Sequence, residues 1–211
     1  MQDKGKKIAE FLLSVEAFRF RPHEPFRWSS GWRSPVYCDN RILLSYPDIR
    51  NYLADEFARL VRQVFPGAQA IAGVATAGIA HGVLAADRLS MPFAYVRPQP
   101  KAHGTGRQIE GRLQPNEPVV VIEDLISTGK SSLQAIEALR AAGIEVLGTL
   151  AIFSYGFNQA TLAFEQAGVQ LETLTTMTVL MQQAEKMNYL SAEQFELIRQ
   201  WQKAPQNWRN T

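Results

Sequence analysis

The sequence predicts an α/β fold in which helices flank a central, mostly parallel β-sheet. From residue 69 onward, short apolar runs that suit buried strands alternate with amphipathic helical patterns. The connections between them are short, which favours parallel strands with helices on both faces of the sheet. The chain has 211 residues, of which 46% are hydrophobic, so it can bury a sizeable core, and we expect one domain over residues 1–211.

The N-terminal part precedes this regular alternation. Apolar residues recur at helical spacing over residues 6–18 and predict an amphipathic helix. Over residues 21–46, proline, glycine and serine interrupt a series of aromatic residues, which predicts short strands and turns. Pro47 then opens a second helix, whose pattern ends at Pro66-Gly67.

The alternating pattern from residue 69 onward is expected to form the sheet. After it, a final helix is expected to begin at Ser191, which forms a capping-box pattern with Gln194. In an open parallel sheet, ligands bind beyond the carboxyl ends of the strands, so we look for function in the loops that follow them. We expect strands at 69–73, 93–96, 119–122, 146–153 and 169–174, and helices at 78–89, 131–142 and 158–167.

Composition excludes several classes of protein. Lys and Arg total 22 against 20 Asp and Glu, and this net charge of +2 is too even for a general nucleic-acid-binding surface. No apolar run approaches the ~20 residues that a membrane helix needs. The single cysteine, Cys38, cannot form an internal disulfide, and the N-terminus lacks a signal-peptide pattern. We therefore expect a cytoplasmic protein without a membrane or nucleic-acid partner, in which any anion site is local.

The loop after the strand at 119–122 carries the most specific signal. Two adjacent carboxylates precede a Ser/Thr/Gly turn that opens a helix, where main-chain N–H groups and the helix dipole favour a phosphate. The carboxylates suit ribose hydroxyls and would stabilise a cationic anomeric carbon. The segment is Glu123, Asp124, Leu125, Ile126, Ser127, Thr128, Gly129, Lys130 and Ser131.

Other interpretations of this loop are weaker. A Walker A loop would need glycine where the chain has Asp124, and a G-x-G-x-x-G motif has no match after a strand. The remaining alternative is a capped helix with solvated acids at the end of a strand. The small-residue loop at 73–78 suits either a second phosphate contact or close packing of a helix on a strand.

A long, basic, glycine-rich segment occupies residues 97–112. A connection of this length is usually functional, and its cations repel one another until a polyanion such as pyrophosphate neutralises them. The pattern predicts a mobile loop that closes on ligand, with His103 as a proton donor to a departing phosphate oxygen; the alternative is a solvated basic hairpin. Its cationic candidates are Arg97, Lys101, His103, Arg107 and Arg112.

Together these motifs resemble the type I phosphoribosyltransferase family, and within it the orotate-specific branch found in Gram-positive bacteria. The stretches that carry the resemblance occur in the family's order and span nearly the whole chain. They are PFRWSSGWRSPVYCDNR at 25–41, GVATAGIAHG at 73–82, YVRPQPKAHGTGRQIEG at 95–111 and VVVIEDLISTG at 119–129.

The resemblance implies a fold, a reaction and a set of partners. The type I phosphoribosyltransferase fold would carry a small N-terminal hood over the base, at about 19–46, and a mobile loop at 97–112. The implied reaction transfers a phosphoribosyl group from phosphoribosyl pyrophosphate to orotate. Mg²⁺ would be held through the substrate and by no metal site of the protein. The implied assembly is a homodimer in which the loop of one subunit reaches the other subunit's site.

The resemblance also implies roles for single residues. Lys101, His103 and Asp124 would be catalytic. Arg97, Lys101 and His103 would contact the pyrophosphate from across the dimer. The segment 123–131 would hold the ribose 5-phosphate, and Ser127 would also touch orotate.

The chain departs from the family pattern in the basic loop. Relatives carry a further lysine where this chain has Pro98 and Gln99. A charge-assisted contact is worth roughly 1.5–3 kcal/mol, so we expect turnover or substrate affinity some ten- to hundredfold lower unless Arg107 or Lys130 substitutes.

The familiar partners of the orotate carboxylate are also absent. In the enterobacterial branch they occupy positions that here hold Ser29, residues 154–155 and Thr76-Ala77. Arg33 and Arg41 are the candidate replacements, and either is equally suited to a surface or a dimer contact.

Two other functions remain open. A purine or xanthine phosphoribosyltransferase would share the phosphate apparatus, but the hood sequence resembles the orotate branch. A non-catalytic regulator that senses phosphoribosyl pyrophosphate and binds nucleic acid would need a basic face, and the net charge of +2 weighs against it.

Overall fold

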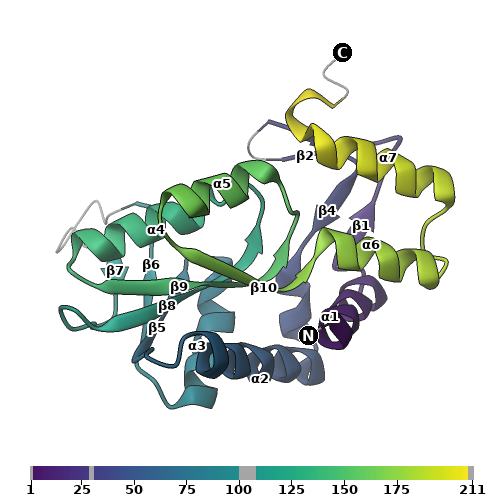
Figure 1. Ribbon diagram of the computed structural model, residues 1–211. Coiled ribbons are helices and arrows are strands. Elements are labelled where there is room, and N and C mark those ends of the chain that lie inside the picture. Colours follow the sequence, from purple (N-terminus) through teal and green to yellow (C-terminus); the bar gives the residue numbers. More distant parts are fainter. Residues whose placement is uncertain (1, 29–30, 100–107, 209–211) are drawn as a thin grey trace.

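The computed structural model describes residues 2–28, 31–99 and 108–208 (Figure 1). Its centre is a six-stranded sheet in the order β10-β9-β8-β5-β6-β7. All neighbouring pairs are parallel except β6 and β7, which are antiparallel. The strands are β5 (Ala70–Val74), β6 (Phe93–Val96), β7 (Ile109–Glu110), β8 (Pro118–Ile126), β9 (Glu145–Ser154) and β10 (Gln170–Thr176).

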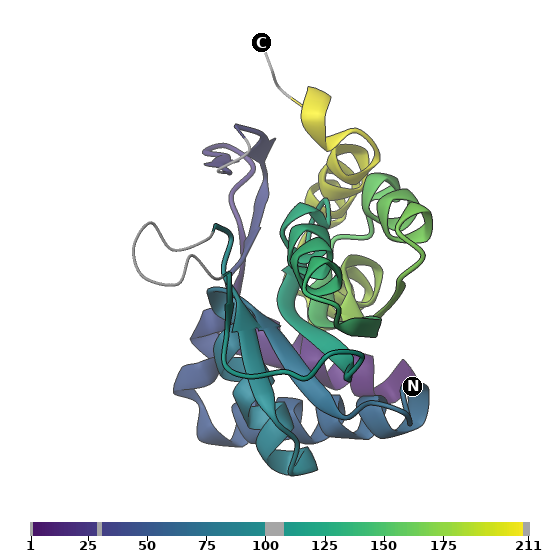
Figure 2. The same ribbon diagram turned by 90° about the vertical axis from the view of Figure 1, so that its left-hand side faces the viewer.

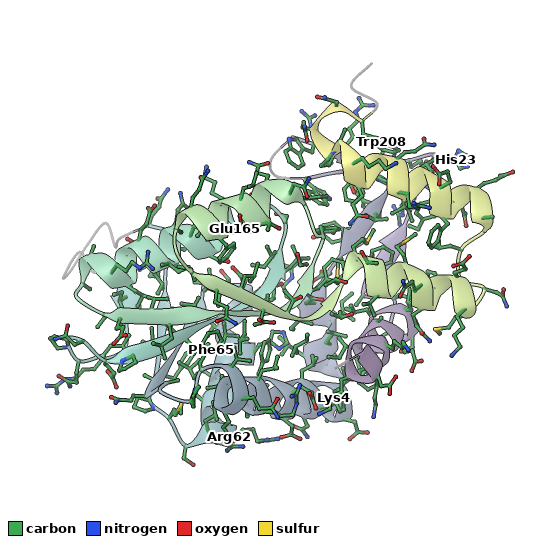
Figure 3. All side chains as sticks on the ribbon, viewed as in Figure 1. Lys4, His23, Arg62, Phe65, Glu165 and Trp208 are labelled. Atoms are coloured by element: carbon green, nitrogen blue, oxygen red, sulfur yellow. The ribbon has the colours of Figure 1, made fainter. Side chains whose placement is uncertain are left out.

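Helices cover both faces of this sheet, and side chains fill the space between the layers (Figures 1 and 3). Strand β8 contributes side chains to two apolar clusters. Val119 and Val121 pack in one of them, and Val120 and Ile122 pack in the other. The predicted mostly parallel α/β fold is therefore confirmed. The helices are α1 (Gln2–Ser14), α2 (Pro47–Val64), α3 (Ala77–Leu89), α4 (Lys130–Ala141), α5 (Asn158–Gln166), α6 (Met177–Lys186) and α7 (Ala192–Lys203).

Several predicted element limits are wrong. The first helix ends at Ser14 because Glu16 has a positive φ of 55°, and Phe18 belongs to strand β1 (Phe18–Phe20) instead. Strand β8 continues four residues past Ile122, since β9 pairs with it as far as Ile126. Helix α6 was not expected; the side chain of Thr176 caps it by accepting from the N–H of Val179.

The predicted hood forms a small layer of its own. Strand β1 pairs with β4 (Val36–Cys38), and β2 (Phe26–Arg27) pairs with β3 (Arg33–Ser34), both antiparallel. A 3₁₀ helix, η1 (Asn40–Ser45), returns the chain to α2, and a second, η2 (Pro205–Asn207), follows α7. Figure 2 shows the hood strands at the end of the molecule opposite α2 and α3.

An aromatic cluster fastens the hood to the rest of the molecule. The ring of Trp28 lies 4.8 Å from that of Tyr155 and 5.7 Å from that of Trp201, measured between centroids. Trp201, on α7, is fully buried and donates through Nε1 to the carbonyl of Arg33 at 3.3 Å. Helix α7 thus braces the hood against the end of β9.

Of the helices in the described part of the chain, none is long and apolar enough to cross a membrane.

Candidate active site

The two adjacent carboxylates lie inside strand β8, near its carboxyl end. Pairing with β5 stops at Ile122, opposite Gly73, whereas pairing with β9 continues. Glu123 and Asp124 therefore lie where the sheet opens, which is the edge where ligands bind in folds of this kind. The sequence interpretation placed them just after the strand, and the structure corrects this by extending the strand beneath them.

Glu123 connects the strand to the helix that follows it. Its side chain is only 6% exposed; Oε1 accepts from the N–H of Asp124 at 3.0 Å, and Oε2 accepts from Oγ of Ser132 at 3.1 Å. Burial raises the pKa of the Glu123 carboxyl well above its ordinary value, and the neighbouring charge of Asp124 raises it further. Burial also raises the pKa of Asp124, while a hydrogen bond with the Glu123 side chain opposes that rise. Negative charge is costly here, and bound hydroxyl donors or cations would offset that cost.

Replacing Glu123 by glutamine is expected to stabilise the fold. A carboxyl whose pKa is raised by folding binds its proton more tightly in the native state, so wild-type stability falls as pH rises from the ordinary carboxyl value through the raised one. Glu123→Gln removes that loss; its amide oxygen can still accept from the N–H of Asp124, and its Nε2 can donate to Oγ of Ser132. We expect about 1 kcal/mol of added stability at pH 8, a Tm rise of about 2–4 °C, and no difference near pH 4.

Calorimetric scans at both pH values check this. Glu137→Gln, an exposed glutamate on α4, is the matched control and should leave Tm unchanged. A lower Tm for Glu123→Gln at pH 8 would show that its ionised form contributes to stability.

The turn at 127–129 leads directly into the first turn of α4. Gly129 has a φ of 80°, and a Cβ there would lie 2.8 Å from the ring of Phe164, so the position requires glycine. No described side chain caps α4 at Gly129, and the first N–H groups of a helix have no partner within it. Lys130 and Ser131 are exposed beside them. The geometry suits a phosphate, as the sequence indicated.

Other members of the segment 123–131 contribute differently. Ser127 and Thr128 are half-buried at the turn, within reach of a ligand. Ile126 is fully buried in the core, and Leu125 packs against the other apolar cluster, so only their main chains remain for a ligand.

The small-residue loop at 73–78 allows close packing. A Cβ on Gly78 would lie 2.5 Å from the carbonyl oxygen of Ile122, so glycine lets the start of α3 rest on β8. The packing interpretation of this loop is therefore supported. Ala75, Arg97 and Ser131 line one small cavity, which brings this loop, the basic segment and the start of α4 together.

The basic segment begins and ends as a hairpin. The N–H of Arg97 donates to the carbonyl of Gln108 at 2.9 Å, and β7 pairs with β6 just beyond. Nη1 of Arg97 lies 3.6 Å from Oε1 of Glu110. The structure therefore adds a strand, Ile109–Glu110, to a segment expected to be irregular. Lys101, His103 and Arg107 lie outside the described residues.

The candidate partners of the orotate carboxylate differ in their surroundings. Arg41 makes two bonds to Asp39, at 2.6 and 2.9 Å, and this pairing neutralises its charge. Arg33 is exposed on β3, and its side chain is not bonded to any residue in the described part of the chain. Ser29 lies outside the described residues. These surroundings favour Arg33 over Arg41.

Two residues prove unremarkable in the structure. Cys38 is buried, and burial raises the pKa of its thiol well above the ordinary value, which disfavours the thiolate that a nucleophile requires. His23 is exposed at a bend, at the outer edge of the hood (Figure 3).

Comparison with known proteins gives the family. Residues 46–168 match the model of the phosphoribosyl transferase domain. An orotate phosphoribosyltransferase of Porphyromonas gingivalis is 51% identical over 208 residues, which cover 99% of each chain. The chain belongs to the orotate phosphoribosyltransferase family. The Streptococcus gordonii relative of the same name is 47% identical over 204 residues, covering 97% of this chain and 98% of that one.

A solved orotate phosphoribosyltransferase has the same fold. The crystal structure from Aeropyrum pernix matches with a TM-score of 0.72 and 31% identity, covering 86% of this chain and 99% of that one. The domain model stops short of the hood and of α7, whereas the match to the orotate phosphoribosyltransferase of P. gingivalis runs through both. The sequence match to this relative therefore includes the residues that form the hood and its brace.

Proposed function

We propose that the carboxyl end of β8 and the start of α4 bind phosphoribosyl pyrophosphate and present its anomeric carbon to orotate. The chain is similar over nearly its whole length to orotate phosphoribosyltransferases, and it catalyses their reaction in pyrimidine biosynthesis: phosphoribosyl pyrophosphate and orotate give orotidine 5′-monophosphate and pyrophosphate. The observation that carries the proposed site is the buried Glu123 and the half-buried Asp124, which lie beside a helix start that no described side chain caps.

Each part of the site has a role in this proposal. The N–H groups and hydroxyls of residues 127–131 hold the 5-phosphate, and Ser127 also touches orotate. Glu123 and Asp124 accept from the ribose hydroxyls, and Asp124 stabilises the cationic ribose as the bond to pyrophosphate breaks. Catalysis comes from positioning and from charges that are already in place.

The basic segment acts on the leaving group. Arg97, Lys101 and His103 neutralise the pyrophosphate, and His103 donates to a departing oxygen. Arg97 is assigned from the sequence motif; the small cavity that it lines with Ser131 lies within its own subunit. Lys101 and His103 are assigned from the sequence motif.

Mg²⁺ fits this site as a companion of the substrate. Within the described ranges, no three His, Cys, Asp or Glu side chains come together as a metal site, whereas Mg²⁺ commonly binds through one or two carboxylates plus substrate phosphates. In this proposal the ion is held through the substrate, with the Glu123–Asp124 pair close to the proposed phosphate position. When bound, the ion neutralises charge on the pyrophosphate.

The assembly is proposed from the family resemblance. Residues 1–211 act as one domain in a cytoplasmic homodimer, and the loop of each subunit completes the site of the other. The balanced charge supports small-molecule substrates over nucleic acid.

Loss of orotate absorbance tests the reaction. With phosphoribosyl pyrophosphate and Mg²⁺ the signal should fall, and omission of Mg²⁺ should slow it strongly. Xanthine and adenine should give no nucleotide. Nucleotide formation from either purine without turnover of orotate would replace this function with purine phosphoribosyl transfer, and ligand-dependent gel shifts without turnover would indicate a regulator.

Restoring the family's lysine should improve the enzyme. Gln99 is exposed at the end of the described part of the basic segment. Gln99→Lys adds a charge-assisted contact to pyrophosphate, so KM for phosphoribosyl pyrophosphate should fall about tenfold or more. Gln166→Lys, at an exposed position on α5, controls for added charge and should leave KM unchanged. An unaltered KM in Gln99→Lys would mean that another cation already fills this place.

A further inference from the structure

A buried polar junction connects the hood to the strand that carries the acids. Asn40, the first residue of η1, has no exposed surface. Its Nδ2 donates to the main-chain carbonyl of Asp124 at 2.6 Å, across 84 positions of sequence. Its Oδ1 accepts from Sγ of Cys38 at 3.4 Å, so both ends of the amide are used and its orientation is set.

The position of this bond explains why it is needed. Strand β5 pairs with β8 only as far as Ile122, and in the described part of the chain only β9 pairs with β8 beyond that point. A buried carbonyl without a donor is costly. Asn40 supplies to Asp124 the donor that the next strand would have supplied.

Asn40 is itself held from a second direction. His81, on α3 and 1% exposed, lies next to the main chain of Asn40, which raises the pKa of the imidazole slightly against the larger effect of burial. Burial lowers the pKa of His81 to about 4, so the imidazole is neutral at physiological pH. The junction therefore joins three parts of the fold: the hood, the helix α3 that follows the small-residue loop, and β8.

We infer that Asn40 is a positioning residue, whose side-chain amide fixes the main chain at Asp124 and so aims the Asp124 carboxylate at the ribose. The inference rests on the role proposed above for Asp124. The same bond ties the hood, which covers the base, to the carboxylate that faces the anomeric carbon.

The test is a double-mutant cycle. Asn40→Ala should lower kcat about 10- to 100-fold, because small misplacements of catalytic groups have effects of this size, with a smaller change in KM for phosphoribosyl pyrophosphate. If Asn40 acts through Asp124, the double variant Asn40→Ala, Asp124→Asn should be no slower than Asp124→Asn alone. A purely structural role would give multiplicative losses instead.

Controls separate the possible failures. Asn51→Ala, an exposed asparagine on α2, should retain wild-type kcat. Asn40→Asp, with the same shape but no amide donor, carries the cycle if Asn40→Ala fails to fold by circular dichroism. Wild-type kcat in Asp124→Asn would overturn the proposed role of Asp124. An impaired Asp124→Asn with multiplicative losses, or an unimpaired Asn40 variant, would overturn the inference about Asn40 alone.

Discussion

Asp124→Asn is expected to lower kcat by about 100- to 1,000-fold, the effect typical of removing one preorganised electrostatic contact to a transition state. Asparagine keeps the size of the side chain and its capacity to accept from a ribose hydroxyl. It loses the negative charge, which matters only once the ribose becomes cationic. Calorimetric binding of phosphoribosyl pyrophosphate should therefore change much less than turnover.

A matched control separates local from general charge effects. Asp87 lies on α3 with its side chain 71% exposed and paired with Arg88. Asp87→Asn should retain wild-type turnover. Equal kcat values for Asp124→Asn and the wild type would remove the basis for a charge-stabilised ribose at this strand.

Lys101→Ala is expected to reduce turnover by a similar factor, about 100-fold, by leaving the pyrophosphate charge uncompensated. The proposal that Lys101 serves the other subunit's site makes a sharper prediction. Equal amounts of Lys101→Ala and Asp124→Asn subunits, allowed to exchange, should recover about a quarter of wild-type activity, because half of the dimers are mixed and each mixed dimer has one intact site of two.

The mixture distinguishes the two arrangements of the loop. If the loop served its own subunit, every site in a mixed dimer would carry one of the two substitutions, and the mixture would be as inactive as its components. Lys186→Ala, an exposed lysine on α6, is the control and should match the wild type when assayed alone.

Much of the fold follows from local pattern. Alternating apolar strands and amphipathic helices predicted the parallel sheet, and its observed strands β5, β6, β8, β9 and β10 overlap the expected ones. The turn proposed to bind a phosphate was also predictable in its position, because residues 127–131 are contiguous and lead directly into a helix. The wrong predictions concern the ends of elements, because pairing between strands that are distant in sequence determines where a strand ends. Strand β8 reaches Ile126 because β9 pairs with it that far.

Contacts between distant residues could not be predicted. In the sequence, Asn40 is one residue of an irregular, aromatic-rich segment with no predicted role. Only the packing of η1 against the end of β8 brings it to Asp124. Arg41 and Asp39 are only two residues apart in sequence, yet the motif did not show that they pair. It therefore left open whether Arg33 or Arg41 is available to bind the orotate carboxylate. Helix α6 was missed, and its threonine cap follows directly from β10.

By itself, then, the sequence determined the fold class and the positions of the acid pair and of the turn before α4, because each depends on residues that are close along the chain. The tertiary structure decided where β8 ends, what holds Asp124 in place and which arginine of the hood keeps its charge available. Those features depend on hydrogen-bond partners far apart in sequence, or on one of several geometries that the same local sequence permits. Burial makes these partners necessary, because removing a carbonyl or carboxylate from water costs free energy unless the folded chain supplies a hydrogen-bond donor.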